Sequence, residues 1–265
     1  MTEKFLNFQI LNPSPELFPY VRSYWYFSGH QPVIGYHEEF MNPTGGYGIA
    51  FNFGNNLLVD GKYLTESVFL DGANTISRKV GFIGHVELLG VRFREGGAYP
   101  FLGIPLSELK NELAVWATSD RNKLMELHAR LSEFKTMESR IRLIETWLRK
   151  RLTLGLANPK IIQASLSLQR EFGTNKKVPY LANELGIGQR QLERLYHIHV
   201  GMTPKQYSQL QRLEAARTAL KRWNGETTTS LALELGYFDQ AHFIREFKEV
   251  LQVTPFVYMK RYEKK

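Results

Sequence analysis

The chain has 265 residues, of which 43% are apolar and 23% charged, so we expect a globular protein with a buried core rather than a disordered one. It contains no cysteine, which excludes disulfides, thiolate zinc sites and cysteine nucleophiles. No stretch approaches the roughly 18 apolar residues of a membrane span, and the first ten residues do not resemble a signal peptide. We therefore expect a cytoplasmic protein that has no membrane partner.

The net charge of +8 is unevenly distributed along the chain. Residues 1–159 hold 17 basic and 16 acidic residues, whereas residues 160–265 hold 17 basic and 10 acidic ones, a net charge of +7. A basic excess confined to one part of a chain indicates binding to a polyanion such as nucleic acid. A solubilising surface would explain the same excess equally well, so charge alone leaves both interpretations open.

Residues 1–118 have the pattern of a β-rich domain. Short aromatic and β-branched runs at 24–27, 49–53 and 88–93 are separated by Gly, Pro and Asn turns, among them 42–46 and Asp71-Gly72. Many short strands with such turns predict a barrel or a sandwich.

The pattern changes at residue 119. Between Ser119 and Leu152 the apolar residues recur at helical spacing without a glycine, which predicts two amphipathic helices. We expect residues 119–159 to form a helical connector, with a hinge near 154–159. The apolar faces of these helices could serve either a homodimer or packing within the chain.

An internal repeat occupies the C-terminal part of the chain. Residues 181–186 (LANELG) and 231–236 (LALELG) are offset by 50, whereas Leu192 corresponds to Phe243 at an offset of 51. The second copy therefore has one extra residue in its turn. In each copy a short helix ends at a glycine, and a second helix turns an apolar side towards the first.

Such a pair of helices is a helix-turn-helix unit, and the outer side of its second helix faces DNA. Arg pairs with guanine and Gln with adenine, so these residue types can recognise base edges. The outward residues are Gln189, Arg190, Gln191 and Arg194 in the first copy and Gln240, His242 and Arg245 in the second.

Between the copies, Thr203 can cap a helix and Pro204 suits its first turn. Apolar residues then recur every three or four positions, which predicts one linker helix of about 18 residues. A rigid linker would hold the two units at a constant separation.

The segment from Leu181 to Pro255 resembles the DNA-binding domain of the AraC/XylS family of transcription regulators. The resemblance rests on residues 234–248 (ELGYFDQAHFIREFK), 191–196 (QLERLY) and 201–204 (GMTP). It implies a domain at 160–265 with two recognition helices in successive major grooves of double-stranded DNA. The implied DNA contacts come from Arg190, Glu193 and Arg194 and from Gln240, Ala241, His242 and Arg245.

Two positions depart from the family pattern. Gly188 stands where the family usually has a capping Ser, so we expect a less firmly started first recognition helix. Gln252 stands where the first copy has Gly201, which predicts a differently ended helix or a small strain.

The N-terminal part resembles sensor-like domains that precede some members of this family, through residues 21–25, 42–46 and 90–97. This resemblance implies a small cupin-like β-barrel. The expected fold class is thus α+β: a β-barrel with flanking helices, followed by an all-α DNA-binding domain.

Aromatic side chains and one arginine in the β-rich part could line a pocket for a small-molecule effector, although such residues also form ordinary barrel cores. These candidates are Trp25, Tyr26, Phe51, Phe53, Arg92 and Phe93. The histidines there (His30, His37 and His85) are scattered, so we expect no metal site and no cofactor.

The leading hypothesis is a sequence-specific DNA-binding transcription regulator that responds to a ligand, is not an enzyme, and also has RNA polymerase as a candidate partner. The alternatives are an architectural DNA-binding protein without ligand response and a cupin-type enzyme joined to a DNA-binding domain. A DNA-repair methyl acceptor is excluded because that chemistry needs a nucleophilic cysteine. The sequence does not determine the effector, the operator, the sign of regulation or the oligomeric state.

Overall fold

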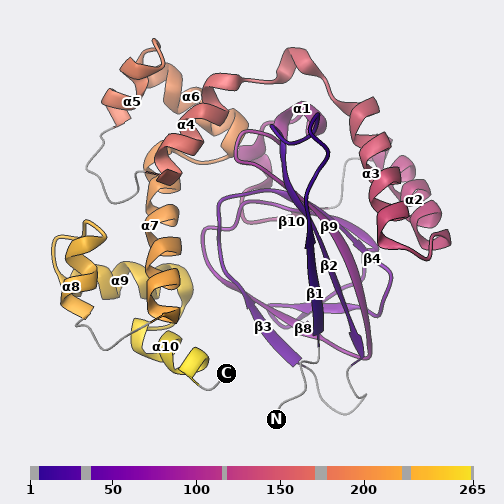
Figure 1. Ribbon diagram of the computed structural model, residues 1–265, viewed down its shortest axis with the longest axis horizontal. Coiled ribbons are helices and arrows are strands. Elements are labelled where there is room, and N and C mark those ends of the chain that lie inside the picture. Colours follow the sequence, from indigo (N-terminus) through magenta and orange to yellow (C-terminus); the bar gives the residue numbers. More distant parts are fainter. Residues whose placement is uncertain (1–5, 31–36, 115–117, 171–177, 223–227, 264–265) are drawn as a thin grey trace.

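The computed structural model describes residues 6–30, 37–114, 118–170, 178–222 and 228–263. It consists of a β-region (residues 6–114), two helices beside it, and a helical region (residues 159–263), as Figure 1 shows. The predicted α+β fold class, with a β-rich N-terminal part and a helical C-terminal part, is confirmed. No helix among the described residues combines the length and hydropathy that crossing a bilayer requires.

Two antiparallel sheets form the β-region. The larger has the strand order β1 (Leu6–Leu11), β2 (Val21–His30), β9 (His85–Phe93), β4 (Gly48–Asn52), β7 (Val68–Asp71) and β10 (Leu113–Ala114). The smaller has the order β3 (His37–Met41), β8 (Arg78–Phe82), β5 (Leu57–Val59) and β6 (Lys62–Leu64). Buried side chains from both sheets pack together in one cluster, among them Ala50, Leu57, Phe69 and Phe82, so the sheets face each other.

Strand alternation divides the larger sheet into an inner and an outer face. Ala50 and Leu88 point towards the smaller sheet, whereas Phe51, Leu89 and Val91 belong to a second cluster on the outer face. Beyond β9 the chain continues through α1 (Tyr99–Leu102) and η1 (Leu106–Leu109).

The two predicted amphipathic helices are α2 (Thr118–Glu133) and α3 (Met137–Arg151). They cover the outer face of the larger sheet, where Leu127, Leu131 and Ile144 are buried in the same cluster as Phe51. Arg140 of α3 also donates a hydrogen bond to Glu87 of β9 at 2.6 Å. Much of the apolar surface that could have served a dimer is thus used within the chain.

The helical region begins after η2 (Leu154–Leu156). Its helices are α4 (Pro159–Arg170), α5 (Val178–Glu184), α6 (Gln189–Val200), α7 (Pro204–Lys221), α8 (Thr228–Glu234), α9 (Gln240–Leu251) and α10 (Pro255–Glu263). The prediction of a linker helix over residues 204–221 is confirmed by α7. Thr203 and Gln206 form a reciprocal capping box at its start, which explains why the helix begins there.

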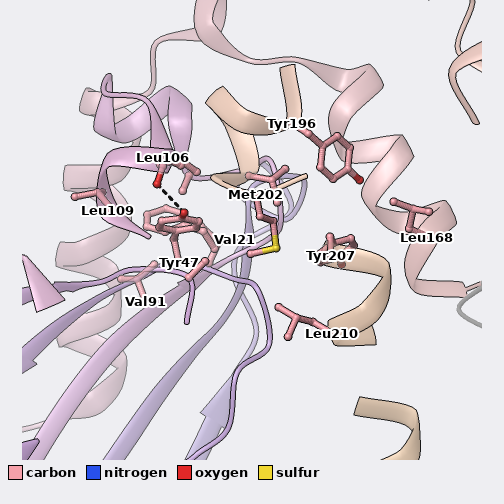
Figure 2. Packing of buried hydrophobic residues seen from close by; sticks show 14 of the residues in the cluster. Val21, Tyr47, Val91, Leu106, Leu109, Leu168, Tyr196, Met202, Tyr207 and Leu210 are labelled. Carbon is pink, nitrogen blue, oxygen red and sulfur yellow. Dashed lines mark hydrogen bonds between the residues drawn. The ribbon is translucent and has the colours of Figure 1, made fainter. Parts of the chain in front are cut away.

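One continuous hydrophobic cluster joins the β-region to the helical region. Figure 2 shows its centre, where the Tyr47 hydroxyl donates a hydrogen bond of 2.7 Å to the Leu106 carbonyl beside Met202, Tyr207 and Leu210. Polar contacts lie at its edge: the Gln211 side-chain amide donates to the Thr44 carbonyl at 3.4 Å, and the Ser77 amide donates to Val250 O at 2.7 Å. Helices α6, α7 and α9 are therefore all in contact with the β-region or its flanking turn.

Candidate nucleic-acid interface

Helices α5 and α6 form a first unit, and α8 and α9 form a second unit with the same local geometry. Gly186 and Gly236 follow the first helix of each unit with φ of +61° and +77°, a left-handed conformation that glycine adopts without strain. The next residue in each unit, Ile187 or Tyr237, donates its backbone N–H to a carbonyl of the preceding helix five residues earlier, at 3.0 and 2.9 Å. The repeat in the sequence is thus a repeat in backbone structure.

The two recognition helices begin differently. Gly188 precedes α6 and offers no side-chain cap, as its departure from the family pattern predicted. Asp239 precedes α9, and its carboxylate accepts a hydrogen bond of 2.7 Å from the His242 backbone N–H. The turn comprises residues 185–188 in the first unit and 235–239 in the second, so Phe238 is the additional residue.

The two recognition helices are followed by residues of the same backbone conformation, although Gly201 follows α6 and Gln252 follows α9. Both residues are left-handed, with φ of +71° and +60°, and both donate their N–H to the last turn of the helix. The hydrogen bonds nevertheless differ: the Gly201 N–H donates to the Tyr196 carbonyl five residues earlier, whereas the Gln252 N–H donates to the Lys248 carbonyl four residues earlier. The second helix is thus ended differently, and its left-handed Gln252 also carries backbone strain.

Each recognition helix is held by its apolar side. Leu192 and Tyr196 of α6 and Phe243 and Phe247 of α9 are fully buried. The Tyr196 hydroxyl also lies 2.9 Å from the Ser165 hydroxyl of α4, inside the core. Burial on one side leaves the opposite side of each helix to solvent.

In the first unit, the predicted DNA-contacting residues lie mainly on that solvent side. Gln189, Arg190, Gln191 and Arg194 are exposed, and Glu193 is half-buried. The Gln189 amide donates to the Glu193 carboxylate at 2.9 Å, one helical turn away. Neither Arg190 nor Arg194 forms an ion pair with a described residue. Both guanidinium groups can therefore donate hydrogen bonds to a phosphate or a base edge.

The predicted residues of the second unit differ in availability. Ala241 and Arg245 are exposed, and Arg245 forms no ion pair with any described residue. The side-chain amide of Gln240 instead bonds the hydroxyls of Thr228 and Thr229 at the start of α8.

His242 also has neighbours within its own unit. Its side chain is 45% exposed, with Nε2 3.7 Å from a Glu246 carboxylate oxygen and the ring edge-on to Tyr237 at 5.3 Å between centroids. Of the four predicted residues of α9, therefore, Ala241 and Arg245 are the two whose side chains have no internal partner among the described residues.

An ion pair between the half-buried Arg212 and the buried Glu246 fixes α9 on the linker helix. Arg212 of α7 donates to both carboxylate oxygens of Glu246 at 3.1 and 3.0 Å, and the Tyr237 hydroxyl donates to the same carboxylate at 2.8 Å. Burial, reinforced by Glu246, raises the pKa of Tyr237. The sequence analysis did not identify Arg212 or Glu246, because two residues 34 positions apart carry no periodic signal.

Two of the predicted ligand-lining residues belong to the inner face of the larger sheet. Trp25 packs in the cluster between the sheets and against Gly90. The Arg92 guanidinium lies 3.8 Å from the Asp71 carboxylate. Asp71 was expected in a turn, but it is the last residue of β7 and is buried, which raises its carboxyl pKa.

The other four predicted ligand-lining residues face away from that interior. Phe51 and Phe93 are fully buried in the outer cluster, against which Tyr26 and Phe53 pack. The Phe53 ring stacks on His128 of α2 with centroids 4.6 Å apart. The sheet thus separates the six candidates instead of bringing them together, because side chains alternate along each strand.

The three candidate histidines of the β-region lie on strands of both sheets. His30 lies opposite His85 in the β2–β9 ladder, and His37 lies opposite Phe82, with its side chain outside the described set. Across the described residues, no group of three His, Cys, Asp or Glu side chains could hold a metal ion.

Two known family models each match one part of the chain. Residues 181–261 match a helix-turn-helix domain, and residues 9–114 match a domain of unknown function (DUF6597). An uncharacterized HTH-type transcriptional regulator of Haemophilus influenzae is 26% identical over 109 residues, covering 41% of this chain and 36% of that protein. The HTH-type transcriptional regulator ArgR of Pseudomonas aeruginosa is 28% identical over 102 residues, covering 38% and 31%.

The chain thus spans about a third of the length of these curated relatives. Among solved structures, ToxT from Vibrio cholerae aligns over 97% of this chain and 98% of its own at 13% identity, with a TM-score of 0.48. An AraC-type regulator from Chromobacterium violaceum aligns over 39% of this chain and 92% of its own at 24% identity, with a TM-score of 0.38.

Proposed function

We propose, from the AraC-type helix-turn-helix domain that this chain carries at its C-terminus, that the protein is a sequence-specific DNA-binding transcription regulator. The observation that carries the proposal is the duplicated unit with an exposed arginine at the matched position of each recognition helix. Arg194 and Arg245 are both exposed, and neither forms an ion pair with a described residue. A guanidinium without an internal partner is suited to a guanine edge or a phosphate.

The linker helix supports recognition of two sites at a constant spacing. α7 has 18 residues and no internal Gly or Pro, so it is a rod of about 27 Å at 1.5 Å per residue. α7 packs against the β-region, and its Arg212 pairs with Glu246 of α9. These contacts restrict the movement of α7 relative to the second unit. We therefore propose that the two units bind successive major grooves on one face of the duplex, about 34 Å apart.

The proposed division into domains is residues 1–118, 119–159 and 160–265, of which the first is the candidate sensor. Ligand response is supported by the contacts that the β-region makes with α6, α7 and α9, because a change there would reach both units. Arg92 and Asp71, on the inner face, are polar groups that an effector could contact. The alternative is an architectural DNA-binding protein that does not respond to a ligand. A metabolite that changes the affinity for DNA would favour the sensor over this alternative.

The test uses the full chain and duplexes selected from a random DNA pool. Arg194→Ala and Arg245→Ala should each weaken binding to the selected duplex by about 1–3 kcal/mol and relax the preference at one base pair. Arg130→Ala, at an exposed arginine of α2, is the matched control and should leave affinity unchanged.

Inserting two base pairs between the two half-sites should abolish simultaneous binding, because it rotates one site by about a fifth of a turn. Failure of the folded wild-type chain to enrich any duplex would refute the proposed function. Equal weakening on all sequences would instead reassign the two arginines to phosphate contacts.

A further inference from the structure

The second unit has one residue more than the first, and the structure identifies it as Phe238. The turns match up to Ile187 and Tyr237, after which Gly188 directly starts α6 whereas Phe238 precedes the capping Asp239. The first unit shows that a four-residue turn is enough to join such helices. The unit's fold therefore does not require the extra residue.

Phe238 also contributes little to packing within the chain. Its side chain is 87% exposed, the largest exposed fraction among the exposed large hydrophobic residues of the described chain. Because this side chain is exposed, it contributes almost no burial free energy to folding, and its apolar surface is available to a partner.

Phe238 stands next to the N-terminal end of α9, the end that the proposed function places at the DNA. It lies two residues before the start of the recognition helix, and the N-terminal residues of such a helix are the ones that contact base edges. Ala241, three residues further on, presents an exposed methyl group, and Arg245 lies one helical turn beyond Ala241 on the same side. Gln240, which directly precedes Ala241, has its side-chain amide bonded to Thr228 and Thr229.

The start of α9 therefore offers the exposed apolar side chains of Phe238 and Ala241 beside the polar Asp239 and His242. The start of α6 offers only exposed polar side chains, those of Gln189, Arg190 and Gln191. In the major groove, the one apolar group that distinguishes a base pair is the 5-methyl group of thymine, which phenylalanine and alanine side chains can contact. We propose that Phe238, together with Ala241, makes the second unit select thymine through its methyl group. This inference rests on the proposed DNA-binding function.

The test compares thymine with deoxyuridine, which differs only by that methyl group. In the duplex selected by the wild-type chain, thymines of the second half-site are replaced by deoxyuridine one at a time. At one or two positions the wild-type protein should lose about fourfold in affinity, the value of one methyl group at about 0.8 kcal/mol. Phe238→Ala should bind the thymine duplex more weakly and respond at most weakly to the same replacements.

Phe256→Ala is the matched control, because Phe256 is another exposed phenylalanine of the helical region, at 57%. It should keep the wild-type sensitivity to deoxyuridine. Circular dichroism verifies that each variant is folded, which we expect because both side chains are exposed. The inference is overturned if Phe238→Ala and the wild-type chain select the same sequence and respond equally to every replacement. If the wild-type chain selects no DNA, the proposed function fails, and this inference fails with it.

Discussion

The contact between the β-region and the helical region depends on Gly201, at the end of the first recognition helix. A Cβ atom on this residue would overlap the Tyr47 hydroxyl and lie 2.7 Å from the Leu106 carbonyl oxygen. These are the two groups joined by the buried hydrogen bond of 2.7 Å. Gly201→Ala is therefore the smallest change that forces the two regions apart at this point.

The loss of stability has two parts. A non-glycine residue at φ of +71° costs about 1–2 kcal/mol in backbone strain. Displacing Tyr47 from Leu106 leaves buried polar groups without partners, at about 1–3 kcal/mol. Gly201→Ala should therefore destabilise the folded chain by about 2–5 kcal/mol.

Gly186→Ala separates these two parts. Gly186 has φ of +61°, but nothing lies within 4 Å of the position a Cβ would occupy, so this variant suffers the strain alone, about 1–2 kcal/mol. Urea unfolding followed by circular dichroism gives the free energy of unfolding of both variants. Equal losses for the two variants would refute the reasoning, because they would mean that the β-region does not pack on Gly201 in solution.

Three further results are expected. Burial lowers the pKa of His199 to about 4, so below about pH 6.5 the unfolded chain binds a proton at this residue and the folded chain does not. The free energy of unfolding should therefore fall by about 2 kcal/mol between pH 7.5 and pH 5. A His199→Phe variant whose stability has the same pH profile as the wild type would contradict this. Glu246→Leu leaves Arg212 without its carboxylate partner and should lower the free energy of unfolding in urea by about 2–4 kcal/mol. Glu249→Leu, at an exposed position of the same helix, should lower it by under about 0.5 kcal/mol. Similar losses for the two variants would contradict a stabilising Arg212–Glu246 pair. Gln252→Gly should raise the melting temperature by relieving about 0.5 kcal/mol of net strain, and a lowered melting temperature would show that the φ of +60° is not strained.

The amino-acid sequence by itself determined most of the helical region. Glycines at 186 and 236, the Thr203-Pro204 start and the apolar spacing of α7 are local signals, and each acts within a few residues of where it stands. Helix ends and caps depend on such short-range preferences, so the two units and the linker helix could be predicted without knowledge of the rest of the chain.

Tertiary structure decided which of the candidate residues are available. The bonds of Gln240 to Thr228 and Thr229 depend on how α8 lies against α9. Likewise, only the close approach of the β-region distinguishes Gly201, which has no room for a Cβ, from Gln252, which is exposed. Such contacts join residues far apart in the chain, and no local pattern encodes them.

The β-region shows the same division. Its aromatic runs predicted strands, because β-branched and aromatic residues favour them. Which face each aromatic residue occupies depends on the register between strands: Trp25 lies opposite Gly90 and points inward, whereas Tyr26 lies opposite Leu89 and points outward. A shift of one residue would exchange the two faces, and that register is set by pairing with a strand more than sixty residues away.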